Sequence, residues 1–246
     1  MGTYNLQTVT HVQHWSDRTF SFRCTRNASF RFAAGEFVMI GLEIDGRAVL
    51  RAYSVASAPW EPELEFLSIK IDHGELTSRL QHIQPGDQVC IGERPTGTLR
   101  NEALAPGRDL WMLATGTGLA PFMSLTRDID TIERWQHLHV VHSVRHADDL
   151  AYGSQLASAF QGEDLHELLS DRLIYHPVIT GQGQSRIGDQ LASGQLSLDP
   201  EQDRVMLCGN LEFNHDLAAW CRDQGMSEGL MRRPGGFVLE RAFVEK

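Results

Sequence analysis

Close cysteine pairs are missing from this chain, although it contains four cysteines. Cys24, Cys90, Cys208 and Cys221 are widely separated, and no Cys-x-x-Cys spacing occurs. Zinc ribbons and cysteine-bound iron–sulfur clusters are therefore not expected. Scattered thiols of this kind are typical of a reducing compartment, where disulfides are rare.

The chain also lacks an excess of positive charge and a long apolar run. Its 246 residues include 22 Lys and Arg against 32 Asp and Glu, which gives a formal net charge of -10 at pH 7. A general nucleic-acid binder would usually be basic. No apolar run reaches the roughly 20 residues that cross a bilayer, and residues 1–10 do not resemble a secretory signal. We expect a cytoplasmic protein with no nucleic-acid or membrane partner.

The arrangement of residues disfavours a histidine metal site and a serine hydrolase site. The chain has 11 histidines, but no His-x-x-x-His stands on a convincing helix with a third ligand. His137, His139 and His142 fall on or beside one expected strand, so we interpret them as structural and expect no metal site. Ser54 and Ser124 lack the Gly-x-Ser-x-Gly elbow of a serine hydrolase.

The first hundred residues are expected to form an antiparallel β-barrel. Asp45-Gly46 predicts a hairpin turn, and Leu76, Leu80 and Ile83 have the spacing of one short helix. Many short strands at this spacing indicate a barrel. The expected strands include residues 20–24, 37–40, 51–54, 64–71 and 89–92.

The pattern changes after residue 100, which we take as the domain boundary, with domains 1–100 and 101–246. We expect residues 101–108, a polar stretch containing Pro106-Gly107, to form a linker. A helix is expected over residues 150–160. Apolar strands that alternate with helices predict a five-stranded parallel sheet covered on both faces. The expected strands are residues 110–114, 139–144, 174–179, 205–208 and 237–239.

The segment Gly116-Thr117-Gly118-Leu119-Ala120-Pro121 lies between an apolar strand and an expected helix. It differs from a full Gly-x-Gly-x-x-Gly because Pro121 stands at the third glycine. Proline is well tolerated in the first turn of a helix, and a helix N-terminus favours phosphate. The setting predicts a nucleotide-binding turn, with a plain tight turn as the alternative.

An arginine follows the second expected strand of the parallel sheet, at Val144-Arg145. An NAD site of this type usually has an acidic residue near this place for the ribose 2′-hydroxyl. A guanidinium suits a 2′-phosphate instead, and Arg186 is a second candidate for the same phosphate. The alternative is a surface arginine paired with Asp148 or Asp149.

The segment Arg51-Ala52-Tyr53-Ser54 ends an alternating run in the first domain. Residues two apart on a strand face the same way, so Arg51 could hold a phosphate while Tyr53 packs on a ring. The turn at 74–78 offers free N–H groups to a second phosphate. The alternatives are an ordinary amphipathic strand, and an N-cap role for Thr77 or Ser78.

In this order, these segments resemble the ferredoxin–NADP reductase superfamily. The end of the chain, residues 238–246, is similar to the bacterial-type ferredoxin/flavodoxin–NADP reductases, in which an alanine replaces a terminal tyrosine on the flavin. The resemblance implies a monomeric FAD enzyme. Hydride would pass from NADPH to flavin N5, and electrons would then pass singly to ferredoxin or flavodoxin in transient complexes.

The resemblance also implies the residues of the site. Tyr53, Ser54, Cys208, Glu240 and Ala242 would lie at the reacting centre. NADP(H) would contact Thr115, Gly116, Val144, Arg145, Thr180, Arg186, Gly209 and Asn210. FAD would contact Arg51, Ala52, Tyr53, Ser54, Ser68, Ile69, Lys70, Gly74, Glu75, Leu76, Thr77, Thr117, Ala242 and Phe243, the last against its adenine.

The sequence departs from the family after the third parallel strand, where Thr180 is followed by Gly181 instead of the usual arginine. One phosphate contact is therefore missing, and a weaker preference for NADPH is expected. The alternatives to the reductase are the reductase component of an oxygenase, an NAD(P)H–flavin reductase, and a redox or nucleotide sensor that binds FAD without turnover.

Overall fold

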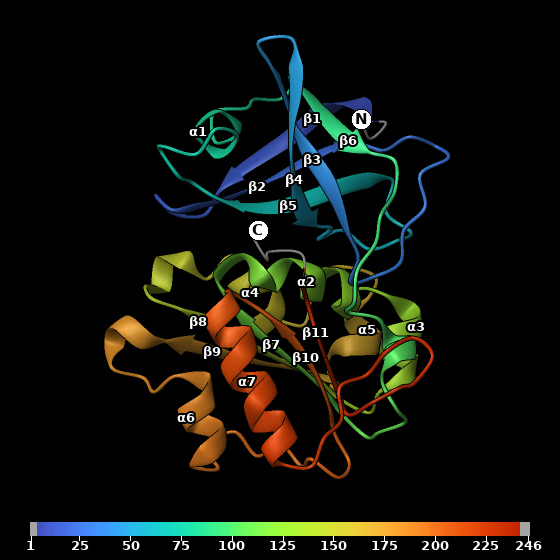
Figure 1. Ribbon diagram of the computed structural model, residues 1–246, viewed down its shortest axis with the longest axis vertical. Coiled ribbons are helices and arrows are strands. Elements are labelled where there is room, and N and C mark those ends of the chain that lie inside the picture. Colours follow the sequence, from blue (N-terminus) through green and yellow to red (C-terminus); the bar gives the residue numbers. More distant parts are fainter. Residues whose placement is uncertain (1–3, 242–246) are drawn as a thin grey trace.

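An antiparallel sheet and a parallel sheet form the framework of the protein, seen in a computed structural model that describes residues 4–241 (Figure 1). The antiparallel sheet has the strand order β4-β3-β6-β1-β2-β5. A short helix, α1 Thr77–Leu80, precedes its last strand. The strands are β1 Tyr4–His14, β2 Thr19–Thr25, β3 Phe37–Ile44, β4 Arg47–Ser54, β5 Glu63–Ile69 and β6 Gln88–Gly92.

The antiparallel sheet curls into a barrel-like shape because its edge strands meet. Val55, just after β4, pairs with Phe66 of β5, and the Ala56 amide donates a hydrogen bond to the Glu65 carbonyl at 2.8 Å. The predicted antiparallel fold of the first domain is therefore confirmed.

Local sequence explains the strands and turn of this sheet. Phe20, Phe22 and Cys24 of β2 are completely buried in one core, as their spacing of two predicts. Asp45 and Gly46 join β3 to β4 with φ angles of 51° and 75°, the left-handed conformation that a two-residue hairpin loop needs.

The parallel sheet has the order β11-β10-β7-β8-β9. Its strands are β7 Leu110–Thr115, β8 Leu138–Val144, β9 Leu173–Ile179, β10 Arg204–Cys208 and β11 Phe237–Leu239. The helices are α2 Ala120–Thr126, α3 Ile129–Arg134, α4 Gly153–Ala157, α5 His166–Leu169, α6 Ile187–Ala192 and α7 Leu211–Asp223. The predicted five parallel strands are all present.

Both faces of the parallel sheet are covered. Met112 and Ala114 of β7 belong to a core shared with α2 and with residues of the barrel, whereas Trp111 and Leu113 face a second core with α6 and α7. In Figure 1, α2 and α4 accordingly lie between the sheet and the barrel. This double cover explains why the strands are continuous apolar runs.

A buried charge cluster joins the two domains. Arg127, at the end of α2, lies 2.9 Å from Glu61 and 3.5 Å from Glu65 of the barrel. Tyr152 of the α/β domain donates a hydrogen bond to Glu65 at 2.9 Å. All four side chains are buried. Glu65 also pairs with Arg23 of its own domain at 3.2 Å, whereas the ion pairs of Arg127 are to the barrel.

One expectation about local structure is wrong. The helix expected over 150–160 is limited to α4, because Ala159 and Phe160 have φ angles of 47° and 56°. This turn of the chain buries Phe160 in the core, so tertiary packing overrides the apolar spacing. The segment expected to be the linker packs on the α/β domain, where Asn101 forms hydrogen bonds with Thr131 and Trp135.

Within residues 4–241, none of the helices is long and apolar enough to cross a membrane.

Candidate functional site

A cavity of about 1080 Å³ opens at the carboxyl ends of the parallel strands. The chain runs from β7 outward to β8 and β9 on one side, and it later adds β10 and β11 on the other. Open α/β sheets bind ligands at this reversal of strand order. Ile69 and Lys70, at the end of β5, bring the barrel to the cavity wall.

The glycine-rich turn after β7 lines this cavity through Thr115, Gly116, Thr117 and Gly118. It forms a 3-10 turn that leads directly into α2, with Pro121 in the first turn of that helix. A Cβ atom on Gly118 would lie 2.1 Å from the Cys208 carbonyl oxygen. Glycine is therefore required here for the turn to pack against the end of β10.

His142 of β8 contacts the glycine-rich turn through a hydrogen bond. Its Nε2 lies 3.0 Å from the Gly116 carbonyl oxygen, and its Nδ1 lies 3.4 Å from the Tyr175 hydroxyl. Burial lowers the pKa of His142 to about 4. The neutral ring can then donate from Nε2 to Gly116 and accept from Tyr175, which holds the turn in one position.

Arg145 and Arg186 come together on the cavity wall with Thr180. Asp149, one of the partners considered for Arg145, is bound instead by Arg18 and Ser16. Among residues 4–241, neither Arg145 nor Arg186 has an ion pair. Two unpaired guanidinium groups at one cavity are a suitable binding site for a phosphate.

The glycine at position 181 has a packing role. Its amide donates to the Arg145 carbonyl at 2.9 Å, and a Cβ atom would lie 2.2 Å from that oxygen. The chain after β9 thus packs tightly on the chain after β8. The same contact places Arg145 and Thr180 side by side.

The start of α7 provides the opposite wall. Asn210 caps the helix by accepting a hydrogen bond from the Phe213 amide at 2.8 Å. Gly209 and Asn210 line the cavity, and so do Phe213 and Trp220 of α7. The helical spacing that follows the Asn210 cap is a signal that sequence reasoning could have used to find Phe213.

Arg18 and Asp149 are also cavity residues that the sequence reasoning missed. Arg18 lies between β1 and β2, and its guanidinium binds the Asp149 carboxylate at 2.9 Å. They are 131 residues apart. No local signal connects them, because the contact exists only when the two domains are together.

The predicted flavin residues of β4 lie in the barrel beside β5 and outside the cavity wall. The Tyr53 hydroxyl is 3.1 Å from Ser68 Oγ, and burial raises the pKa of Tyr53. The Ser54 Oγ is buried and, within residues 4–241, has no hydrogen-bond partner. A buried hydroxyl without a partner is costly, so an acceptor or donor on a bound group fits this position.

The predicted phosphate turn lies next to Arg51. Glu75 pairs with Arg47, and its carboxylate is also 3.7 Å from Arg51. The N-cap position of α1 is Leu76, which has no side-chain cap hydrogen bond. The alternative N-cap role of Thr77 and Ser78 is therefore wrong.

Two residues predicted at the reacting centre are buried and do not line this cavity. Cys208 is completely buried, and burial raises the pKa of its thiol well above the usual value. Glu240, just after β11, is also buried and accepts a hydrogen bond from the Arg241 amide at 2.7 Å. Ala242 and Phe243 lie outside the described residues.

Comparisons with known proteins agree with this arrangement. Residues 4–100 match the oxidoreductase FAD-binding domain, and residues 112–218 match the oxidoreductase NAD-binding domain. The chain is 47% identical over 250 residues to the flavodoxin/ferredoxin–NADP reductase of Rhodobacter capsulatus, covering 97% of this chain and 93% of that protein.

Two further relatives match almost from end to end. The ferredoxin–NADP reductase of Azotobacter vinelandii is 43% identical over 258 residues and is covered completely, as is this chain. A ferredoxin NADP+ reductase from Neisseria gonorrhoeae, solved with bound FAD and NADP, superposes with a TM-score of 0.89 at 28% identity, covering 99% of this chain and 100% of that one. Sequence, fold and cavity together show that the chain belongs to the ferredoxin/flavodoxin–NADP reductase family.

Proposed function

We propose that the protein exchanges electrons between NADP(H) and ferredoxin or flavodoxin through FAD. The observation that carries this proposal is the cavity at the carboxyl edge of the parallel sheet, where the glycine-rich turn faces Ile69 and Lys70 of the barrel. One site for a dinucleotide thus opens directly onto the domain expected to hold the flavin.

On the nucleotide side, the chain would bind and orient NADP(H). The turn at 115–118 offers backbone N–H groups to a pyrophosphate, and its position is supported by the contact between His142 and Gly116. Arg145 and Arg186 would hold the 2′-phosphate by charge-assisted hydrogen bonds. Thr180, Gly209 and Asn210 would shape the rest of this surface.

On the flavin side, the chain would position the ring and the phosphates. The ring would lie against Tyr53, and Ser54 Oγ would reach N5. Arg51 and the turn at 74–77 would hold the pyrophosphate, with Ala52, Ser68, Ile69, Lys70 and Thr117 around them. The chemistry that FAD supplies when bound is acceptance of a hydride at N5 and release of single electrons.

The end of the chain has a proposed role as well. Ala242 would cover the flavin face and Phe243 would reach the adenine, while Glu240 would handle a proton nearby. Cys208 would support the nicotinamide side from beneath, because its own thiol is buried.

We also propose that the protein is a cytoplasmic monomer that forms transient complexes with its electron partner. The four cysteines are buried free thiols, which suits a reducing compartment. Size-exclusion chromatography with light scattering tests the oligomeric state.

Absorbance of the purified protein tests the activity itself. We expect a yellow protein that NADPH bleaches and that ferredoxin or flavodoxin then reoxidises. A yellow protein that NADPH does not bleach would indicate the sensor. A colourless protein that reduces added flavin would indicate the flavin reductase. Reoxidation only by an oxygenase component would indicate the reductase component of an oxygenase.

A further inference from the structure

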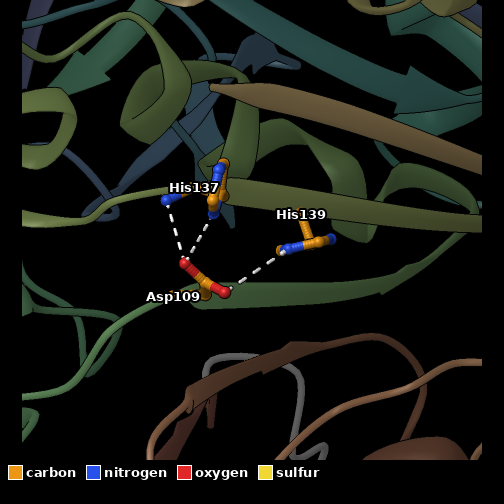
Figure 2. Close-up of side chains that lie close together, drawn as sticks. All are labelled: Asp109, His137 and His139. Atoms are coloured by element: carbon orange, nitrogen blue, oxygen red, sulfur yellow. Dashed lines mark hydrogen bonds and ion pairs between the residues drawn. The ribbon is translucent and has the colours of Figure 1, made fainter. Parts of the chain in front are cut away.

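A second cluster of polar side chains lies at the opposite edge of the parallel sheet from the nucleotide cavity. Asp109 immediately precedes β7, His137 immediately precedes β8, and His139 is the second residue of β8. Figure 2 shows the Asp109 carboxylate directed at both imidazoles. The cavity residues Thr115 and Val144 stand at the other ends of these strands. The cluster is therefore separate from the site described above.

The possible ligand atoms of these three residues lie close to one another. His137 Nδ1 lies 2.9 Å from Asp109 Oδ1, and His139 Nε2 lies 4.0 Å from Asp109 Oδ2. One ligand atom from each of the three residues lies within 4.8 Å of the others. Ligand atoms about 2.0–2.2 Å from a tetrahedral Zn²⁺ are separated by roughly 3.3 Å, so the contact between His137 and Asp109 would lengthen and the one between His139 and Asp109 would shorten around an ion.

The ring of His139 is held in an orientation that suits a metal ligand. Its Nδ1 lies 3.2 Å from His176 Nε2 on β9. Donation from Nδ1 to His176 leaves the lone pair of Nε2 directed at Asp109. Metal-bound histidines typically donate their other ring N–H to a neighbouring acceptor in this way. The ring also stacks on Trp111, with centroids 4.0 Å apart and planes at 3°.

Around the cluster, the two carboxylates of Asp109 and Asp203 outnumber the one guanidinium of Arg108. Arg108 binds Asp109 at 3.0 Å and Asp203 at 2.9 Å, so one guanidinium serves two buried carboxylates. Arg108 binds the Oδ2 atom of Asp109, whereas Oδ1 accepts the His137 amide at 3.1 Å and lies 2.9 Å from His137 Nδ1, so an ion would replace the contact between Nδ1 and Oδ1. Because His137 is half-buried with about a third of its side chain exposed, an ion can reach the cluster from solvent.

We propose that Asp109, His137 and His139 bind one divalent cation of the Zn²⁺ class. Two imidazoles and one carboxylate, with water as the fourth ligand, match the ligand preference of Zn²⁺. Mg²⁺ and Ca²⁺ require more oxygen ligands than the cluster offers. The ion would join the amino ends of β7 and β8 and stabilise the α/β domain, because a ligand that binds only the folded state raises its stability.

The test is calorimetric titration of ZnCl₂ into the FAD-loaded protein after dialysis against EDTA and removal of the chelator. We expect one Zn²⁺ per chain in the wild type. His137→Gln and His139→Gln should each weaken the affinity at least tenfold. The matched control is His11→Gln, because His11 is an exposed histidine on β1, away from the cluster. That variant should bind as the wild type does.

A thermal measurement provides the second readout. Added Zn²⁺ should raise the Tm of the wild type and of His11→Gln, and it should raise the Tm of His137→Gln much less. MgCl₂ should produce no shift. His137 precedes its strand and is partly exposed, so this variant is expected to fold, which flavin absorbance checks. The absence of stoichiometric binding, or equal affinity in His137→Gln and the wild type, would overturn the proposal.

Discussion

Two arginines, Arg145 and Arg186, stand on the cavity wall without an ion pair among the described residues. Each charge-assisted bond to a phosphate contributes roughly 1.5–3 kcal/mol. The 2′-phosphate takes no part in hydride transfer, so its contacts act as uniform binding. We expect Arg186→Ala to raise KM for NADPH by roughly tenfold to a hundredfold, with little change in kcat or in KM for NADH.

Steady-state ferricyanide reduction with both nucleotides measures this effect. Arg145→Ala should behave similarly, and Arg94→Ala is the control, because Arg94 is an exposed arginine of the barrel that does not line the cavity. If both cavity variants keep the wild-type ratio of NADPH to NADH activity, the assignment of the phosphate site is wrong.

Ser54 and Ser124 form a matched pair for testing the flavin site. Both hydroxyls are buried and, within residues 4–241, lack a hydrogen-bond partner. Ser54 ends β4, whereas Ser124 lies in α2. If Ser54 Oγ binds flavin N5, Ser54→Ala should slow flavin reduction by about tenfold, the equivalent of about 1.4 kcal/mol, while Ser124→Ala leaves the rate unchanged.

Stopped-flow absorbance under anaerobic conditions gives the limiting rate of flavin reduction for both variants. In the flavin-free protein, neither substitution should lower the Tm appreciably, since each removes a hydroxyl that makes no hydrogen bond in the described structure. Equal rates in the wild type and Ser54→Ala would remove Ser54 from the reacting centre.

At the scale of elements, β8 supports the turn that follows β7 through the hydrogen bond between His142 and Gly116. His142→Phe keeps a ring but removes the donor to the Gly116 carbonyl. Leaving that carbonyl without its hydrogen bond costs about 1–3 kcal/mol, so the turn is held less firmly. We expect a higher KM for NADPH and an unchanged FAD content. The measurement is NADPH titration together with flavin quantification. A wild-type KM would show that the turn holds its position without His142.

The same histidine predicts a dependence of stability on pH. Its pKa in the folded protein is about 4, lowered by burial, whereas the unfolded chain has an ordinary value near 6.5. The unfolded state therefore binds the proton first, and stability falls as pH drops from about 6.5 toward 4, by at most about 1.4 kcal/mol per pH unit from this group. Urea unfolding of His142→Phe between pH 7 and pH 5 should show a smaller decline than the wild type.

The strands of this protein are predictable because their signals are local. The β2 alternation and the Asp45-Gly46 turn both depend on neighbouring residues. The helix expected over 150–160 failed because Phe160 is buried by a turn of the chain that no local rule requires. At the cavity, the places of Arg145 and Asn210 directly after strands follow from the local sequence. The pairing of Arg18 with Asp149 depends on the domain arrangement.

At the scale of the whole molecule, the buried contact of Arg127 with Glu61 and Glu65 joins the two domains. Removing one partner of a buried ion pair typically costs about 3–5 kcal/mol, because the other charge stays buried. Arg127→Met should therefore destabilise the protein by about that amount.

Urea denaturation followed by far-UV circular dichroism and by flavin fluorescence tests this prediction. The two signals should coincide in the wild type and separate in Arg127→Met, as the barrel and the α/β domain begin to unfold independently. The control is Arg31→Met, an exposed arginine that bonds only to nearby carbonyls, which should change the stability by less than about 0.5 kcal/mol.

The charge cluster at the domain interface also constrains how this chain can recombine with its relatives. Glu61 and Glu65 lie on one side of the domain boundary, and Arg127 and Tyr152 lie on the other. A recombination point between residues 65 and 127 would join Glu61 and Glu65 of one parent protein to the α/β domain of another. Unless the second parent has the same charges at these places, the chimera buries Glu61 or Arg127 without the ion pair that joins them here. These four positions are therefore expected to be inherited as one block, although the sequence separates them.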